Sequence, residues 1–367
     1  MENMLHLRYT TSQAAALPSK YVLADQVPAA SAAGRVSLPL IDMSRSHDEV
    51  RQAILDAGKE FGFFMVVNHG VPDEVMKDMI DVCEEFFRLP AEDKAHLYSE
   101  ERHKPNRMFS SSTYETGGEK YWRDCLHLTL SDGTKDWPQK PLGIREKIEK
   151  FGLLTRGLGM ELLRMLCEAM GVPPDYLMGD ISGYFDMSIN HYPPCPNPSK
   201  TLGLPPHCDR NLITLLHPGK VYGLEVAYKG EWVKVEPVPH AFVVNFGQQL
   251  EVTTNHLLRS GCLSVGWPEN WELIGSELKL QVVTNGLLKS IEHRAVTNSV
   301  VSRTSVAAFI EPTSDCLVGP AEEFISEVNP PFYRTVKYGD FLSIYNVVNL
   351  ASSINLTTNL KNVQKDI

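Results

Sequence analysis

The sequence predicts a mixed α/β chain with an all-β core, a sandwich or barrel of the jelly-roll type, between a helical N-terminal half and a C-terminal helix. Two observations predict this fold class. Before Gly183, apolar residues recur at helical spacing over long segments. After Gly183, short β-rich runs alternate with Pro, Gly and Asn turns. Many short strands at close spacing are typical of sandwiches and jelly rolls.

The helical half begins after an arm, residues 1–36, that shows little periodicity. A stripe of Val50, Ile54, Ala57 and Phe61 predicts the first helix, and Leu89-Pro90 ends the second. We expect helices at 46–62, 73–88 and 143–170, and short strands at 37–42 and 63–68. Together these elements form an N-terminal region that spans residues 37–180.

The β-rich region spans residues 181–332. The final segment spans residues 333–367, and we expect a helix at 333–348 that could close one mouth of the barrel. The expected strands, each bounded by turn residues, lie at 186–192, 212–216, 223–228, 231–236, 241–245, 282–288 and 305–310.

Composition restricts the function classes. The chain has 367 residues, 43% hydrophobic and 22% charged, which is typical of globular proteins and not of disorder. A net charge of −10, without a basic run, argues against nucleic-acid binding. No apolar stretch is long enough to span a bilayer, and the start shows no secretory signal. Seven scattered cysteines are typical of a reduced intracellular protein. We expect a cytoplasmic monomer that binds neither nucleic acid nor membrane.

An internal repeat interrupts the β-rich region. Residues 250–260 recur as 280–290, at an offset of 30, with seven of eleven positions identical. Two copies do not make a solenoid. We interpret the segment near 256–285 as an insert in a strand-to-strand connection, with two possible outcomes: it loops out, or it displaces the strand that follows it.

Three polar motifs flank this insert. His207 and Asp209 stand two residues apart on an expected strand, so both side chains project from one face. His293 lies downstream on another expected strand, and Arg303 and Ser305 share a strand face ten residues later. Two imidazoles and one carboxylate form the facial triad that suits non-haem Fe(II). A planar Arg is the bidentate partner that a carboxylate ligand needs.

With these motifs the chain resembles the plant 2-oxoglutarate/Fe(II)-dependent dioxygenases over nearly its whole length. The similar stretches are residues 38–42, 62–72, 190–196, 206–209, 223–226, 245–248, 290–294 and 303–305.

The resemblance implies a double-stranded β-helix, or jelly roll, and a full set of site residues. His207, Asp209 and His293 would bind Fe(II). Arg303 and Ser305 would hold the distal carboxylate of 2-oxoglutarate and Tyr192 another of its oxygens, with assistance from Asn190. The expected reaction is hydroxylation of a small organic substrate with O₂, giving succinate and CO₂, with ascorbate as an activator.

Residues 99–107, 116–125 and 356–365 resemble members of the family that hydroxylate a phytosiderophore, a polycarboxylate that also carries amines. Arg107, Lys120 and Arg123 are then candidate carboxylate partners, although each one alone also fits a solvated surface. The candidate pocket walls are Tyr114, Phe309 and Tyr345. Two alternatives stay open: a flavonoid, hormone or alkaloid hydroxylase or desaturase of the same family, and a member that the insert has made catalytically inactive. An Arg/Lys-lined pocket would favour the phytosiderophore, and an apolar aromatic one would favour the first alternative.

Overall fold

The computed structural model describes residues 5, 16–24, 27, 30, 37–101, 104–111, 120–131, 136–249, 287–327 and 335–343. The predicted insert, both candidate wall residues Tyr114 and Tyr345, and the C-terminal tail lie outside these residues, as does most of the 1–36 arm.

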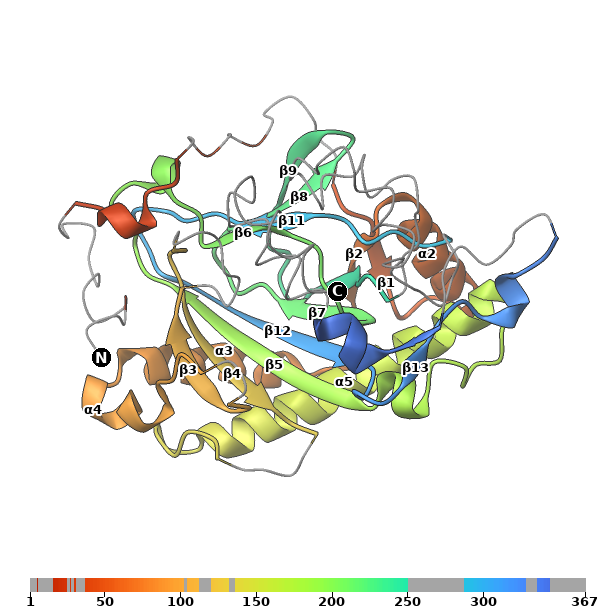
Figure 1. The fold of residues 1–367 in the computed structure, drawn as a ribbon, viewed down its shortest axis with the longest axis horizontal. Coiled ribbons are helices and arrows are strands. Elements are labelled where there is room, and N and C mark those ends of the chain that lie inside the picture. The colour runs from red at the N-terminus through yellow and green to blue at the C-terminus, as the bar shows by residue number, and fades with distance from the viewer. Residues whose placement is uncertain are drawn as a thin grey trace, which may run out of the picture.

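Two facing sheets form a double-stranded β-helix (Figure 1). The large sheet has the strand order β1-β2-β10-β7-β12-β5-β4-β3, and the small sheet has the order β6-β11-β8-β9. Apart from the parallel pair β1–β2, neighbouring strands are antiparallel. The strands are β1 (Leu40–Asp42), β2 (Phe63–Val67), β3 (Arg107–Ser110), β4 (Asp124–Thr129), β5 (Tyr184–Tyr192), β6 (Leu204–His207), β7 (Ile213–His217), β8 (Leu224–Tyr228), β9 (Glu231–Val235), β10 (Phe242–Phe246), β11 (His293–Ala295) and β12 (Arg303–Glu311).

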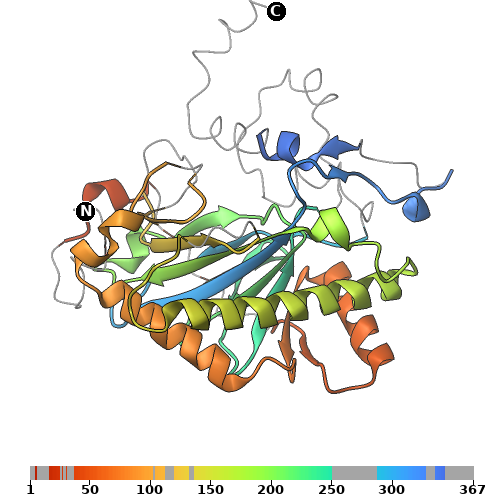
Figure 2. The same ribbon diagram turned by 90° about the horizontal axis from the view of Figure 1, so that it is seen from below.

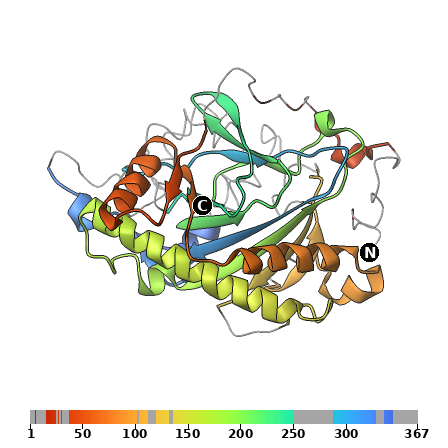
Figure 3. The ribbon, with the colours of Figure 1, turned by 180° about the vertical axis from the view of Figure 1, so that it is seen from behind.

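Helices cover the outer face of the large sheet (Figures 2 and 3). A capping box between Ser46 and Glu49 starts the first of them, and Gly171, with φ of 80°, ends the longest. The α-helices are α2 (His47–Glu60), α3 (Asp73–Arg88), α4 (Ala91–Lys94) and α5 (Ile144–Met170). Short 3₁₀ turns lie at η1 (Ser19–Tyr21), η2 (Ala95–Leu97), η3 (Gly179–Ser182), η4 (Pro198–Lys200) and η5 (Glu322–Phe324).

The observed elements follow most of the predicted ones, with three differences. Strands β3 and β4 were not predicted, because short runs with charged ends carry little periodicity. Strand β6 ends at His207, so Asp209 lies in the loop after the strand and not on its face. A short strand, β14 (Val336–Lys337), which pairs with β13 (Leu317–Val318), lies within the predicted C-terminal helix at 333–348, and only residues 338–343 of the described part are helical. Among the described residues, no helix is long and apolar enough to cross a membrane.

The packing of α5 on the large sheet depends on a glycine. A Cβ at Gly159 would lie 2.5 Å from Ile310 Cδ1 and 3.0 Å from Leu215 Cδ1, and both of these side chains are fully buried. Gly157, one half-turn away on the same helix, has no atom within 4 Å of such a Cβ. The helix therefore lies close against β7 and β12 at Gly159, which fixes the sheet that carries much of the site.

This pair of glycines gives a matched test of the packing. Gly157→Ala should raise stability by about 1 kcal/mol, because alanine favours the helix. Gly159→Ala should lower it by about 1–3 kcal/mol, because its methyl overpacks the core. Urea unfolding of the two variants measures both changes, and an equal gain in stability at the two positions would contradict the close approach of α5.

Candidate active site

Two imidazoles and a carboxylate meet between the two sheets. Strands β6 and β11 pair so that His293 lies opposite His207. Asp209 Oδ1 is 3.6 Å from His207 Nε2 and 3.7 Å from His293 Nε2. One ligand atom from each residue lies within 4.8 Å of the other two, which is a cluster that could hold a metal ion. The third predicted ligand thus lies opposite the first.

Backbone carbonyls orient both histidines. His207 Nδ1 lies 2.8 Å from the carbonyl of Pro205, and His293 Nδ1 lies 3.3 Å from the carbonyl of Ile291. A carbonyl only accepts hydrogen bonds, so Nδ1 carries a proton in each ring, and Nε2 is the ring nitrogen that faces Asp209. Burial and the charge of His293 lower the pKa of His207 to about 3, which keeps this imidazole neutral and able to ligate.

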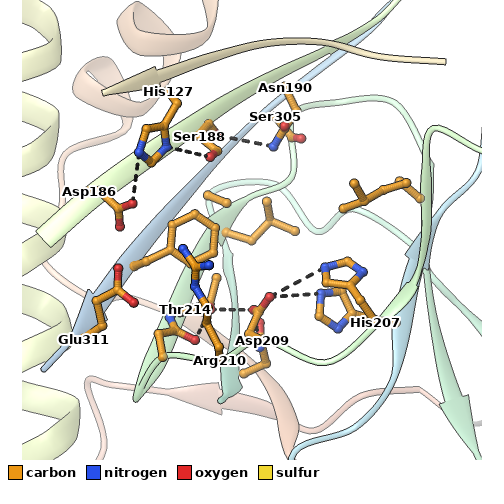
Figure 4. Close-up of a pocket in the computed structure, with 18 of the residues that line it drawn as sticks. His127, Asp186, Ser188, Asn190, His207, Asp209, Arg210, Thr214, Ser305 and Glu311 are labelled. Atoms are coloured by element: carbon orange, nitrogen blue, oxygen red, sulfur yellow. Dashed lines mark hydrogen bonds and ion pairs between the residues drawn. The ribbon is translucent and has the colours of Figure 1, made fainter. Parts of the chain in front are cut away.

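Two neighbours hold the carboxylate of Asp209. Its Oδ2 accepts hydrogen bonds from Thr214 Oγ1 at 2.6 Å and from Asn245 Nδ2 at 2.8 Å. Burial alone would raise the pKa of Asp209, but the two histidines and these two hydrogen bonds lower it below its ordinary value. Asp209 is therefore an anion whose Oδ1 faces the imidazoles (Figure 4). This donor set, two imidazoles and one carboxylate, fits Fe(II).

A buried cation lies at one end of the same cavity. Arg303 is only 3% exposed, and its Nε donates to the carbonyl of Val221 at 3.1 Å. Its guanidinium lies 5.1 Å from the ring centre of Tyr192, the residue opposite it on β5. Among the described residues, no carboxylate lies within ion-pair distance of Arg303. A buried guanidinium without a counter-ion is suited to an anionic ligand.

Alternating side chains of β5 and β12 line this cavity, whose volume is about 790 Å³. From the Arg303 end, β12 contributes Arg303, Ser305, Ala307, Phe309 and Glu311. The register places Asn190 opposite Ser305 and Asp186 opposite Phe309. The β5 residues that line the cavity are Tyr192, Asn190, Ser188, Asp186 and Tyr184.

The two strands that the sequence did not predict add cations to the cavity. Arg107 comes from β3, and Arg123 directly precedes β4. Arg123 Nη1 donates to Asn190 Oδ1 at 2.9 Å, and the Arg107 guanidinium stacks 4.2 Å from the ring centre of Phe109. Lys104 also lines the cavity.

The structure separates the candidate substrate residues into three groups. Arg107, Arg123 and Phe309 line the cavity. Lys120 does not line it, and its backbone N–H donates to the carbonyl of Lys20. Tyr114 and Tyr345 lie outside the described residues.

Several residues of the cavity were not predicted from the sequence. Thr214 and Asn245 support Asp209 through contacts between residues 5 and 36 positions apart, which no local pattern reveals. Asp186 and Glu311 are acids within β strands. Each lies an even number of residues from the other cavity-facing residues of its strand, and this period of two is the signal that could have identified them.

Family models match the two halves of the chain. Residues 38–144 match the non-haem dioxygenase in morphine synthesis N-terminal family, and residues 184–262 match the 2OG-Fe(II) oxygenase superfamily. A crystal structure of JOX2 in complex with 2OG, Fe and JA has a TM-score of 0.74 with this chain, at 29% sequence identity. That comparison covers 93% of this chain and 95% of JOX2.

Two barley (Hordeum vulgare) proteins are similar over essentially their whole length. The chain is 60% identical to 2'-deoxymugineic-acid 2'-dioxygenase, over 100% of both chains. It is 52% identical to mugineic-acid 3-dioxygenase, over 98% of this chain and 99% of the barley protein. The fold and the donor set define a 2-oxoglutarate- and Fe(II)-dependent oxygenase. The chain belongs to the plant 2-oxoglutarate/Fe(II)-dependent dioxygenases and is an oxidoreductase.

The support of Asp209 is testable by removing one hydroxyl. Thr214→Val deletes the 2.6 Å hydrogen bond, so Asp209 should lose orientation and Fe(II) affinity should fall roughly tenfold or more. Anaerobic Fe(II) titration followed by tryptophan fluorescence measures the change. Thr129→Val is the matched control, because the Thr129 hydroxyl contacts Tyr184 and not Asp209. Equal affinities in Thr214→Val and the control would refute the role of Thr214.

Proposed function

We propose that the chain hydroxylates an amino-polycarboxylate of the phytosiderophore class, with 2'-deoxymugineic acid as its substrate. The observation that carries this proposal is the set of cations, Lys104, Arg107 and Arg123, in the same cavity as the histidine–carboxylate triad. Carboxylates are the natural partners of such cations. The 60% identity to the barley 2'-dioxygenase supports the same substrate.

His207, Asp209 and His293 hold the iron in this proposal. Bound Fe(II), with 2-oxoglutarate and O₂, supplies the oxidising chemistry that hydroxylates a C–H bond and yields succinate and CO₂. The chain contributes position and charge: carbonyls fix both imidazole tautomers, and Thr214 and Asn245 fix the carboxylate. Ascorbate serves as an activator that keeps the iron reduced. From composition alone, we further propose a cytoplasmic monomer.

Arg303 and Ser305 hold the distal carboxylate of 2-oxoglutarate, with Tyr192 and Asn190 beside it. Support for this assignment comes from the burial of Arg303 without a described counter-ion and from the register that places Ser305 opposite Asn190. The substrate then occupies the part of the cavity nearer Arg107, Arg123 and Phe309.

Gly223 offers a test of the 2-oxoglutarate site that leaves the metal ligands intact. A Cβ at this position would lie 2.6 Å from Arg303 Cδ and 2.9 Å from its Nε. Gly223→Ala should therefore displace the guanidinium and raise the KM for 2-oxoglutarate several-fold, with little change in Fe(II) affinity. Steady-state succinate formation measures the KM, and Gly157→Ala is the control. An unchanged KM for 2-oxoglutarate in Gly223→Ala would show that Arg303 does not bind its distal carboxylate.

Two rivals differ in the substrate. The flavonoid, hormone or alkaloid alternative requires a largely apolar pocket, and the charged lining of this cavity argues against it. The 52% identity to mugineic-acid 3-dioxygenase favours a closely related amino-polycarboxylate as the second candidate.

Turnover assays separate these candidates. Protein supplied with Fe(II), 2-oxoglutarate and ascorbate should form succinate in step with hydroxylation of 2'-deoxymugineic acid, more slowly with mugineic acid, and only at background level with a flavanone. His207→Ala should abolish this turnover, because one of three iron ligands is lost. Mass spectrometry of the products and succinate assays provide the measurement. Turnover of the flavanone without turnover of 2'-deoxymugineic acid would overturn the proposed substrate, and full activity of His207→Ala would overturn the metal site.

A further inference from the structure

Two acids lie at the end of the cavity opposite Arg303. Asp186 on β5 and Glu311 on β12 both line it (Figure 4). They follow Ser188 and Phe309, respectively, in the order of cavity-facing residues away from Arg303. Glu311 is six residues from Ser305 along β12, which at about 3.3 Å per residue places the two roughly 20 Å apart. Glu311 is therefore too far from Ser305 to contact the same 2-oxoglutarate molecule, and Asp186, opposite Phe309, is roughly 13 Å along the strands from the level of Ser305.

The carboxylate of Asp186 is incompletely paired. The residue is 5% exposed, and its Oδ1 has no hydrogen-bond partner among the described residues. Its Oδ2 lies 3.4 Å from His127 Nε2. Burial and nearby arginines lower the pKa of His127 to about 4, so this imidazole is neutral at physiological pH and provides no countercharge.

Glu311 brings a second negative charge to the same place. Its Oε2 accepts a hydrogen bond from the hydroxyl of Tyr338, which contributes no positive charge. Burial and the charge of Glu311 raise the pKa of Asp186 well above its ordinary value, and the charge of Arg210 offsets part of this rise. Two buried acids this close are ionised together only when a cation joins them; otherwise one of them takes up a proton.

We propose that Asp186 and Glu311 form a cation subsite that binds a protonated amine of the substrate. This inference rests on the proposed function, since it assigns the amine of an amino-polycarboxylate to the acids and its carboxylates to Arg107 and Arg123. The cavity then carries two poles of opposite sign, which select a zwitterion over a plain polycarboxylate. A flavonoid-type substrate has no cation to satisfy these acids.

The test measures ligand binding to the full chain loaded with 2-oxoglutarate and Mn(II), which replaces iron so that no turnover occurs. Asp186→Asn and Glu311→Gln should each weaken binding of 2'-deoxymugineic acid roughly tenfold or more, the loss expected for a charge-assisted hydrogen bond. Both should change the affinity for the amine-free tricarboxylate propane-1,2,3-tricarboxylate less than twofold. Asp315→Asn, which removes an exposed carboxylate outside the cavity, should bind both ligands like the unmodified chain.

The amine-free ligand separates a binding role from a structural one. If the acids only pair with Arg210 or stabilise the fold, both variants lose affinity for the two ligands equally, and the proposal is overturned. An unchanged affinity for 2'-deoxymugineic acid in both variants overturns it as well. Glu311→Gln retains an acceptor for the Tyr338 hydroxyl, so it keeps the test open if Asp186→Asn does not fold.

A second ligand pair separates this proposal from the proposed substrate. 6-Aminohexanoate and hexanoate differ in one terminal ammonium group, and competition against 2'-deoxymugineic acid, or direct calorimetry, measures both. The unmodified chain should prefer 6-aminohexanoate, and Asp186→Asn should abolish that preference. If the unmodified chain binds 6-aminohexanoate and hexanoate equally, the cation subsite is overturned. If the chain prefers 6-aminohexanoate but does not turn over 2'-deoxymugineic acid, the proposed substrate is overturned and the cation subsite is still supported.

Discussion

The pairing of β6 with β11 is the constraint on which the site depends. It sets His293 opposite His207 and brings both Nε2 atoms to the side where Asp209 projects from the following loop. The carboxylate is buried, and burial opposes its charge. The Thr214 hydroxyl and the Asn245 amide offset that penalty by donating hydrogen bonds to its Oδ2. A preformed donor set of this kind needs little rearrangement to accept Fe(II).

The large sheet supplies many of the other side chains that line the cavity. Alternation along β5 and β12 divides their side chains between the core under α5 and the cavity. On the cavity face, the order along β12 runs from Arg303, the proposed 2-oxoglutarate anchor, past Ser305, to the acid Glu311. We propose that one end of this face binds carboxylates and the other end binds an amine. The cluster of His207, Asp209 and His293 lies on the facing small sheet and the loop that follows β6. Substrate charge, and not only shape, would decide what binds.

Sequence patterns predicted the helices and most strands because amphipathic periods and turn residues are local signals. They also predicted His207, Asp209, His293, Arg303 and Ser305, whose spacing matches a family motif. Local signals could not reveal that β3 and β4 extend the large sheet, because those strands are specified by pairing with β5 rather than by their own pattern. The same limit hid the supports Thr214 and Asn245 and the acids Asp186 and Glu311. Asp209 was placed on a strand that in fact ends two residues earlier, at His207, yet its role in the donor set does not depend on that difference.

The most direct test is a crystal structure of the chain with Fe(II) and 2-oxoglutarate, grown without oxygen and measured at the iron absorption edge. We expect one anomalous peak bound by His207 Nε2, His293 Nε2 and a carboxylate oxygen of Asp209, with a 2-oxoglutarate carboxylate on Arg303 and Ser305. Iron bound elsewhere, or 2-oxoglutarate with its distal carboxylate away from Arg303, would contradict this expectation.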